Sequence, residues 1–150
     1  MLMSTYDADY FLWTQEQATA LRSLRQTNAL DIDHLAEEIE DMGRSELNKV
    51  ASLLTQMLVH LMKLRHASET NARGHWLEEI MAFQAAARRA YTPGMRQRLD
   101  LDDIWRDACR IVEAAGTGAV FPNSTIPFTL DQLLDRSFDP VTLLAPLPAS

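Results

Sequence analysis

Hydrophobic residues recur at three- and four-residue intervals from residue 31 to residue 66. Because an α-helix advances by about 100° per residue, this spacing places them on one face of a single helix. At about 1.5 Å per residue, that helix is roughly 50 Å long. Asp31 or Asp33 is expected to cap its N-terminus. The apolar stripe comprises Ile32, Leu35, Ile39, Met42, Gly43, Val50, Leu53, Leu54, Met57, Leu61 and Leu64.

Gly43 lies in the interior of this predicted helix. A glycine there costs about 1 kcal/mol relative to alanine, so its presence calls for a structural reason. Its position on the apolar face predicts the close approach of another helix. A kink or a break at Gly43 is the alternative.

The same spacing predicts three more long helices. A helix that Asp7 or Thr5 caps precedes the stripe, and a polar turn over residues 68–74 follows it. A proline disfavours helical geometry in the residue before it, so Thr92-Pro93-Gly94 is expected to end the third helix. The predicted ranges are about Asp7 to Arg25, His75 to Tyr91 and Met95 to Ala115.

The C-terminal part of the chain has a different character. Phe121-Pro122 and Ile126-Pro127-Phe128 are apolar and extended, and they are expected to pack across the other helices. Thr129 and Gln132 form a capping box for a short helix that ends at Leu134. Residues 141–150 are rich in proline and leucine, and we expect this tail to be only partly ordered.

These elements predict an all-α fold. We expect one domain over residues 1–140, an antiparallel helical bundle built around the long second helix. It contains about four main helices and a short C-terminal helix. At 150 residues, a single domain with one hydrophobic core is the natural expectation.

Composition and charge narrow the function classes. The net charge of −7 repels phosphate backbones, so a nucleic-acid partner is disfavoured. The single cysteine, Cys109, forms no intrachain disulfide and fits a reducing compartment. The first residues have no signal-peptide pattern, and no apolar run is long enough to span a membrane. We therefore expect a soluble cytoplasmic protein that does not contact a membrane.

Glu46 is the main candidate for a functional residue, because it lies about 20° from the centre of the stripe. A carboxylate buried there has to be paired, protonated or exposed by a gap. The structural interpretation is a buried pair with Trp13, Arg106 or Arg110. The functional interpretation is a ligand-binding or metal-binding bundle, perhaps an enzyme, in which Tyr10 and Trp13 are the aromatic neighbours of Glu46.

The other polar clusters have simpler explanations. His34 could converge with Glu37 and Glu38, but His34, Glu37 and Asp41 point to the outer side of the helix, as a solvated surface does. His60 lies at the edge of the stripe, about 21 Å along the helix from Glu46, so the two cannot share one metal ion. The sequence therefore predicts no metal site, no cofactor and no catalytic residue. A basic stretch that could hold a phosphate comprises Arg88, Arg89, Arg96 and Arg98.

Three segments carry a resemblance to a known family. They are Tyr6-Asp7-x-Asp9-Tyr10-x-x-Trp13-Thr14-x-Glu16-Gln17-Ala18, then Leu35-Ala36-Glu37-Glu38-Ile39-Glu40-Asp41-Met42-Gly43-Arg44-Ser45-Glu46, and Pro127-Phe128-Thr129-Leu130-Asp131-Gln132-Leu133-Leu134. Together they resemble the bacterial family called domain of unknown function 29, over roughly residues 6 to 140. The resemblance implies an all-helical bacterial domain and transfers no activity.

The preferred hypothesis for function is a non-catalytic interaction or adaptor module that binds a protein partner or forms a homo-oligomer. The predicted 35-residue helix is longer than the shorter helices are expected to cover. Its C-terminal end would then expose Leu61, Met62 and Leu64 to a partner. The alternative is the ligand-binding or metal-binding bundle centred on Glu46.

Overall fold

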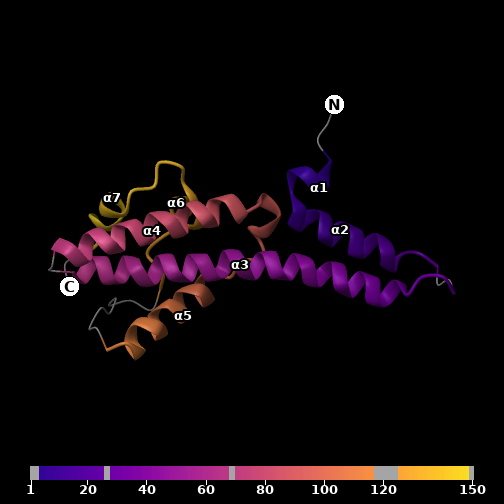
Figure 1. Cartoon of the computed structure of the whole chain (residues 1–150), viewed down its shortest axis with the longest axis horizontal. Helices are drawn as coiled ribbons and strands as arrows, with labels where there is room; N and C mark the ends of the chain where they lie inside the picture. Colours follow the sequence, from indigo (N-terminus) through magenta and orange to yellow (C-terminus); the bar gives the residue numbers. More distant parts are fainter. Residues whose placement is uncertain (1–3, 26–27, 68–69, 117–124, 149–150) are drawn as a thin grey trace. The chain divides into compact units, whose positions relative to one another are not determined.

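The computed structural model describes residues 4–25, 28–67, 70–116 and 125–148 (Figure 1). These residues contain helices and no β-strand, which confirms the predicted all-α class and the long helix. The helix expected first is divided in two, so the long helix is α3. The elements are α1 (Thr5–Ala8), α2 (Tyr10–Arg22), α3 (Ile32–His66), α4 (Thr70–Ala90), the 3-10 helix η1 (Pro93–Met95), α5 (Leu101–Ala114), α6 (Leu130–Leu134) and α7 (Pro140–Leu144).

The helices form two compact units. Unit 1 comprises Met1–Val50 and Ala90–Leu99, and unit 2 comprises Ala51–Arg89 and Asp100–Ser150. The first 19 residues of α3 (32–50) belong to unit 1 and its remaining 16 (51–66) to unit 2. That the chain is a single domain stays a prediction.

The long helix begins as its sequence predicts. Of the two expected caps, Asp31 is the one in place: its side chain accepts a hydrogen bond from the backbone N–H of His34 at 3.4 Å. Its carbonyl accepts the bond from Leu35 that starts the helix. The helix continues through Gly43 without a break, so the predicted close approach, and not the kink, is correct.

The N-terminal helix differs from its prediction, because it breaks at Asp9. Ser4 caps α1 and Asp9 caps α2, so neither Asp7 nor Thr5 has the expected role. The side chain of Asp9 accepts a hydrogen bond from the backbone N–H of Leu12 at 2.9 Å. A new N-cap inside a predicted helix stops the preceding turn and starts the next one.

In unit 2, α4 starts five residues earlier than its sequence predicts. Residues 70–74, expected in a polar turn, are helical. The side chain of Arg73 donates a hydrogen bond to the carbonyl of Leu64, at 3.1 Å, near the end of α3. This contact between two helices favours the early start, and periodicity along the chain does not reveal it.

The prediction of an uncovered C-terminal end of α3 is wrong. Leu61, Met62 and Leu64 are all buried. Within unit 2, α4 runs along this part of α3 and α5 lies on its other side (Figure 1). The ring of His60 on α3 lies 5.3 Å from that of Phe83 on α4. The apolar side chains of this half-helix therefore form the core of unit 2.

The remaining elements largely follow their capping residues. The fourth long helix starts at Leu101 and not at Met95, because Asp100 caps it. The capping box of Thr129 and Gln132 is confirmed at the start of α6.

The C-terminal segment is attached to α4. The buried amide of Gln84 on α4 donates hydrogen bonds to the carbonyls of residues 133 and 135, at 3.3 and 2.8 Å. The tail expected to be partly ordered begins with α7, and Phe121-Pro122 lies outside the described residues.

Candidate functional site

In unit 1, α2 and α3 pack against each other in antiparallel directions. A Cβ atom placed on Gly43 would lie 2.1 Å from Oγ1 of Thr14, so the two backbones approach closely at this point. Thr14 is fully buried, and its hydroxyl donates to the carbonyl of Phe11 at 2.6 Å. This contact fixes how each helix is rotated and which residues lie opposite one another.

Polar side chains share one side of this helix pair. Arg22 of α2 donates to both carboxylate oxygens of Glu40 on α3. This hydrogen bond holds the pKa of Glu40 below its ordinary value. Next to it, Gln15 and Arg44 line a cavity of about 160 Å³, and Arg98 donates to Oε1 of Gln15 at 3.1 Å. Interactions within the unit satisfy much of this polar surface.

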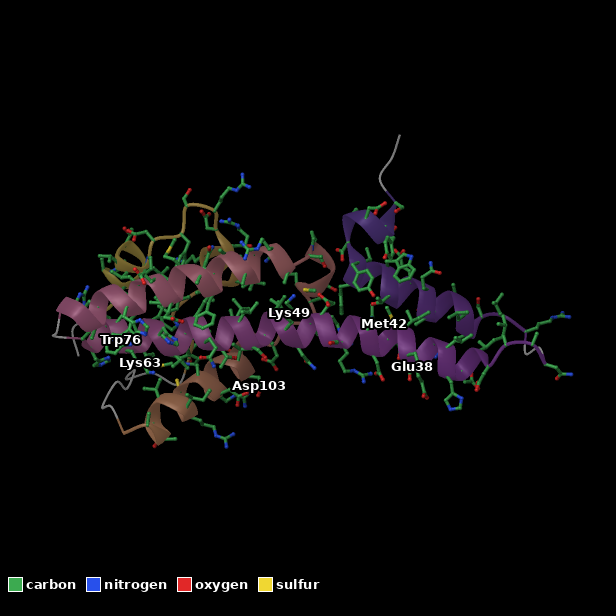
Figure 2. The ribbon with its side chains drawn as sticks, viewed as in Figure 1. Glu38, Met42, Lys49, Lys63, Trp76 and Asp103 are labelled. Carbon is green, nitrogen blue, oxygen red and sulfur yellow. The ribbon has the colours of Figure 1, made fainter. Side chains whose placement is uncertain are left out.

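The side of the helix pair opposite Arg22 and Glu40 carries apolar side chains of α3. Leu35 and Met42 are 40% and 47% exposed, and Ile39 between them is half-buried. Figure 2 labels Met42 on the stretch of α3 that runs along α2. With Glu46, these residues recur at intervals of four, three and four, which keeps them on one edge of the helix. Because α3 buries Ala36, Gly43 and Val50 in unit 1, this edge of the predicted stripe stays uncovered.

A matching edge of α2 lies on the same side. This edge contains Tyr10, Trp13, Gln17 and Leu21. On a helical wheel, it lies about 80° from the buried line through Thr14 and Ala18, on the side away from Arg22. Arg22 reaches Glu40 on the polar side of α3, so the two apolar edges share the other side of the pair. We call this surface the apolar face. It comprises Tyr6 of α1, Tyr10, Trp13, Gln17, Leu21 and Leu24 along α2, and Leu35, Ile39, Met42 and Glu46 of α3.

Three aromatic rings contact one another on the apolar face. Tyr10 and Trp13 stack with ring centroids 5.7 Å apart, and Tyr6 stands edge-on to both. Tyr6 is 53% exposed. Such clusters of tyrosine and tryptophan are typical of protein interfaces, because they supply a large contact area at little conformational cost.

A buried carboxylate fixes the start of α2, the helix that carries Tyr10 and Trp13. Asp9 caps α2, and it also accepts hydrogen bonds from Oγ1 of Thr92 at 2.5 Å and from the backbone N–H of Gly94 at 2.6 Å. It thereby fixes the segment after α4 to the start of α2. Asp9 directly precedes the repeating apolar pattern of α2, and an aspartate in that position is a recognisable N-cap signal that the sequence prediction did not use.

The structure joins only part of the predicted ligand site. Tyr10 and Trp13 contact each other, but no hydrogen bond, ion pair or ring contact of the described residues joins either to Glu46. Glu46 is half-buried and is not the buried partner that its wheel position predicted. The buried line of α3 runs through Gly43, about 60° from Glu46. The expected partners Arg106 and Arg110 form exposed ion pairs with Asp103 and Asp107.

The remaining candidate clusters show no assembled chemical site. Within the described ranges, no three histidine, cysteine, aspartate or glutamate side chains converge on a point where they could hold a metal ion. The pKa of Cys109 is raised by partial burial and by nearby Glu113. No helix in the described part of the chain has both the length and the hydropathy of a membrane span.

Comparison with known proteins gives one family and one solved structure. Residues 5–139 match the family described as domain of unknown function DUF29. An alpha-helical protein of unknown function from Rhodospirillum rubrum has a similar crystal structure, with 36% sequence identity and a TM-score of 0.83. The match covers 96% of this chain and 98% of that one. No functionally curated protein matches the chain.

Proposed function

Because this chain belongs to the family described as domain of unknown function DUF29, whose description carries no activity, we propose a function from its surface: it is a non-catalytic helical interaction module. Its apolar face in unit 1 binds another protein. The C-terminal end of α3, where sequence analysis expected the binding surface, is buried and has no part in the proposal.

The observation that carries the proposal is the position of the exposed apolar side chains. Tyr6 of α1, Leu24, which follows α2, and Leu35 and Met42 of α3 are each at least 40% exposed and belong to the apolar face. Single exposed apolar residues are normal on protein surfaces, but a contiguous group beside clustered aromatic rings is typical of an interface. Among the residues that the structure describes, the polar side of the same pair has no contiguous group of exposed apolar side chains.

The module is proposed to work in the cytoplasm of a bacterial cell. The single cysteine fits a reducing compartment, and the similar solved protein comes from Rhodospirillum rubrum. The proposed partner is a protein, either a second copy of the chain or another chain. The net charge of −7 argues against nucleic acid.

Photo-cross-linking in the native cell tests this proposal. A photoreactive phenylalanine analogue replaces Met42 on the apolar face or, as a matched control, Met81 on α4, which is 43% exposed. We expect one discrete cross-linked product from position 42 and none from position 81. A Leu35→Glu substitution should abolish the product, because it places a charge among the apolar side chains at one end of the face. A chain that gives no product from position 42 contradicts the proposal.

A further inference from the structure

We infer that the protein bound at the apolar face is a second copy of this chain, and that Glu46 of each copy lies beside Tyr10 and Trp13 of the other. The inference rests on the proposed function and adds the identity of the partner. It accounts for a half-buried carboxylate that shares a surface with a stacked tyrosine and tryptophan but makes no hydrogen bond to either within one copy.

Two packed helices form only one layer. Domains normally bury the apolar face of one layer against a second layer. Face-to-face packing of two α2–α3 pairs supplies that second layer and produces an antiparallel four-helix bundle. With a two-fold axis parallel to the helices, α2 of one copy lies against α3 of the other. Every neighbouring pair of helices is then antiparallel, as α2 and α3 already are within each copy.

The contact between Thr14 and Gly43 sets the register of this bundle. A two-fold axis parallel to the helices leaves the level of each residue unchanged, so residues at one level within a copy are also at one level across the interface. Trp13 is one residue before Thr14 and therefore lies at the level of Arg44, whereas Tyr10 lies at the level of Leu47. Glu46 of the second copy falls between these two levels.

The chemistry of these side chains is complementary. An ionised Glu46 can only accept hydrogen bonds, whereas the tyrosine hydroxyl and the indole N–H are donors. Within the described part of the chain, none of these three groups makes a hydrogen bond. Hydrogen bonds to a charged group are among the stronger ones, and two copies related by a dyad form them twice. This self-complementarity favours a second copy over an unrelated partner.

The apolar residues match in the same register. Leu21 and Leu24 lie at the levels of residues 36 and 33, on either side of Leu35 of the second copy. Gln17 lies at the level of residue 40, between Ile39 and Met42. The arrangement therefore places the carboxylate and its donors at one end of the interface and the apolar side chains at the other.

The available area predicts a weak, transient dimer. The 13 residues of α2 extend about 20 Å, and two helices side by side are about 20 Å wide. Face-to-face contact then buries about 400 Å² on each copy and about 800 Å² in total, which is in the range of weak, transient interfaces. We expect a dissociation constant in the micromolar range.

Sedimentation of the full chain over about 1 to 300 µM tests the inference. The wild-type chain should show a monomer–dimer equilibrium, and Glu46→Gln should weaken it about tenfold. The matched control is Glu37→Gln, because Glu37 is exposed on the side of α3 away from the apolar face. A chain that stays monomeric overturns the inference, as does a dimer that Glu46→Gln leaves unchanged. Circular dichroism confirms that each variant is folded.

A disulfide experiment tests which helices face each other. In a Cys109→Ala background, chains with Gln17→Cys are mixed with chains with Met42→Cys and allowed to oxidise. We expect the disulfide between the two different chains to dominate, because α2 faces α3 of the second copy. Preferential pairing of Met42→Cys chains with one another overturns the proposed axis.

Failure of this inference differs from failure of the proposed function. A monomeric chain that still gives the cross-linked product at position 42 binds a different protein, so only the second copy is excluded. A chain that gives no product at that position loses the interaction function itself.

Discussion

Gly43 of α3 and Thr14 of α2 lie so close that no side chain fits between them: a Cβ on Gly43 would be 2.1 Å from Oγ1 of Thr14. This contact determines how the two helices are rotated. It turns Arg22 and Glu40 to one side and leaves Tyr10, Trp13 and Met42 on the other. The absence of a side chain at Gly43 therefore allows the helix rotation that brings these residues together on the apolar face.

Gly43→Ala should destabilise the protein by about 2 kcal/mol, because overpacking outweighs the roughly 1 kcal/mol that alanine contributes to helix propensity. Urea unfolding measures the change. Gly74→Ala in α4 is the matched control, since no other segment of the described residues comes within 4 Å of the added Cβ. That variant should be more stable by up to about 1 kcal/mol. Equal effects of the two substitutions would show that the close approach does not restrict position 43.

Asp9→Ala should cost about 3 kcal/mol, because it removes the N-cap of α2 and the acceptor for Thr92 and Gly94. Thermal and urea unfolding measure the loss. Asp7→Ala is the control, because Asp7 is exposed and, among the described residues, its carboxylate accepts one side-chain hydrogen bond, from Ser4. Its effect should stay within about 0.5 kcal/mol. Comparable losses for the two variants would rule out a special role for Asp9.

The Asp31–His34 pair predicts a pH dependence at the start of α3. Its hydrogen bond raises the pKa of His34 and lowers the pKa of Asp31. Because the pKa of His34 is raised, its contribution to stability is fully present at pH values below the pKa of His34 in the unfolded chain. The contribution is lost as the pH rises through the pKa of His34 in the folded protein. Because the pKa of Asp31 is lowered, its contribution to stability is fully present at pH values above the pKa of Asp31 in the unfolded chain. The contribution is lost as the pH falls through the pKa of Asp31 in the folded protein. The pair therefore contributes most between about pH 4 and pH 6.5.

An NMR titration of His34 measures this effect. Asp31→Asn is a suitable comparison, because asparagine still caps a helix but carries no charge. The pKa of His34 should fall towards its ordinary value in that variant. An unchanged titration would mean that the ion pair does not form in solution.

Cys109 should react slowly with a thiol reagent. Partial burial is the main cause of its raised pKa, and Glu113 adds to it, so little thiolate is present at neutral pH. The rate should be several-fold lower in the folded protein than in urea, and Glu113→Gln should increase it slightly. A folded-state rate equal to that in urea would contradict the assigned environment.

Features of the fold that depend on residues close together in the sequence could be predicted, whereas features that depend on contacts between different helices could not. The capping box of Thr129 and Gln132 is local, and it was predicted at the correct residues. The start of α4 was missed because it involves a hydrogen bond from Arg73 to a carbonyl nine residues earlier, on a different helix. Periodicity also identified the long helix, but it could not show which edge of the stripe another helix covers.

The candidate site shows the same division. The sequence singled out Glu46, Tyr10 and Trp13, and the structure places all three on the apolar face. Their separation within one copy was not predictable, because it depends on how α2 and α3 are rotated about the contact at Gly43. The cap role of Asp9 could be read from the sequence, but its partners Thr92 and Gly94 could not, because they are more than 80 residues away.

The most direct test of the apolar face as a contact between two copies is a dilution series followed by ¹⁹F NMR on protein labelled with fluorotryptophan. Trp13 lies on the face, whereas Trp105 is buried in unit 2 and serves as the internal control. On dilution from about 300 to 1 µM, the Trp13 resonance should move and the Trp105 resonance should stay fixed. A Trp13 resonance that does not change over this range would contradict the account.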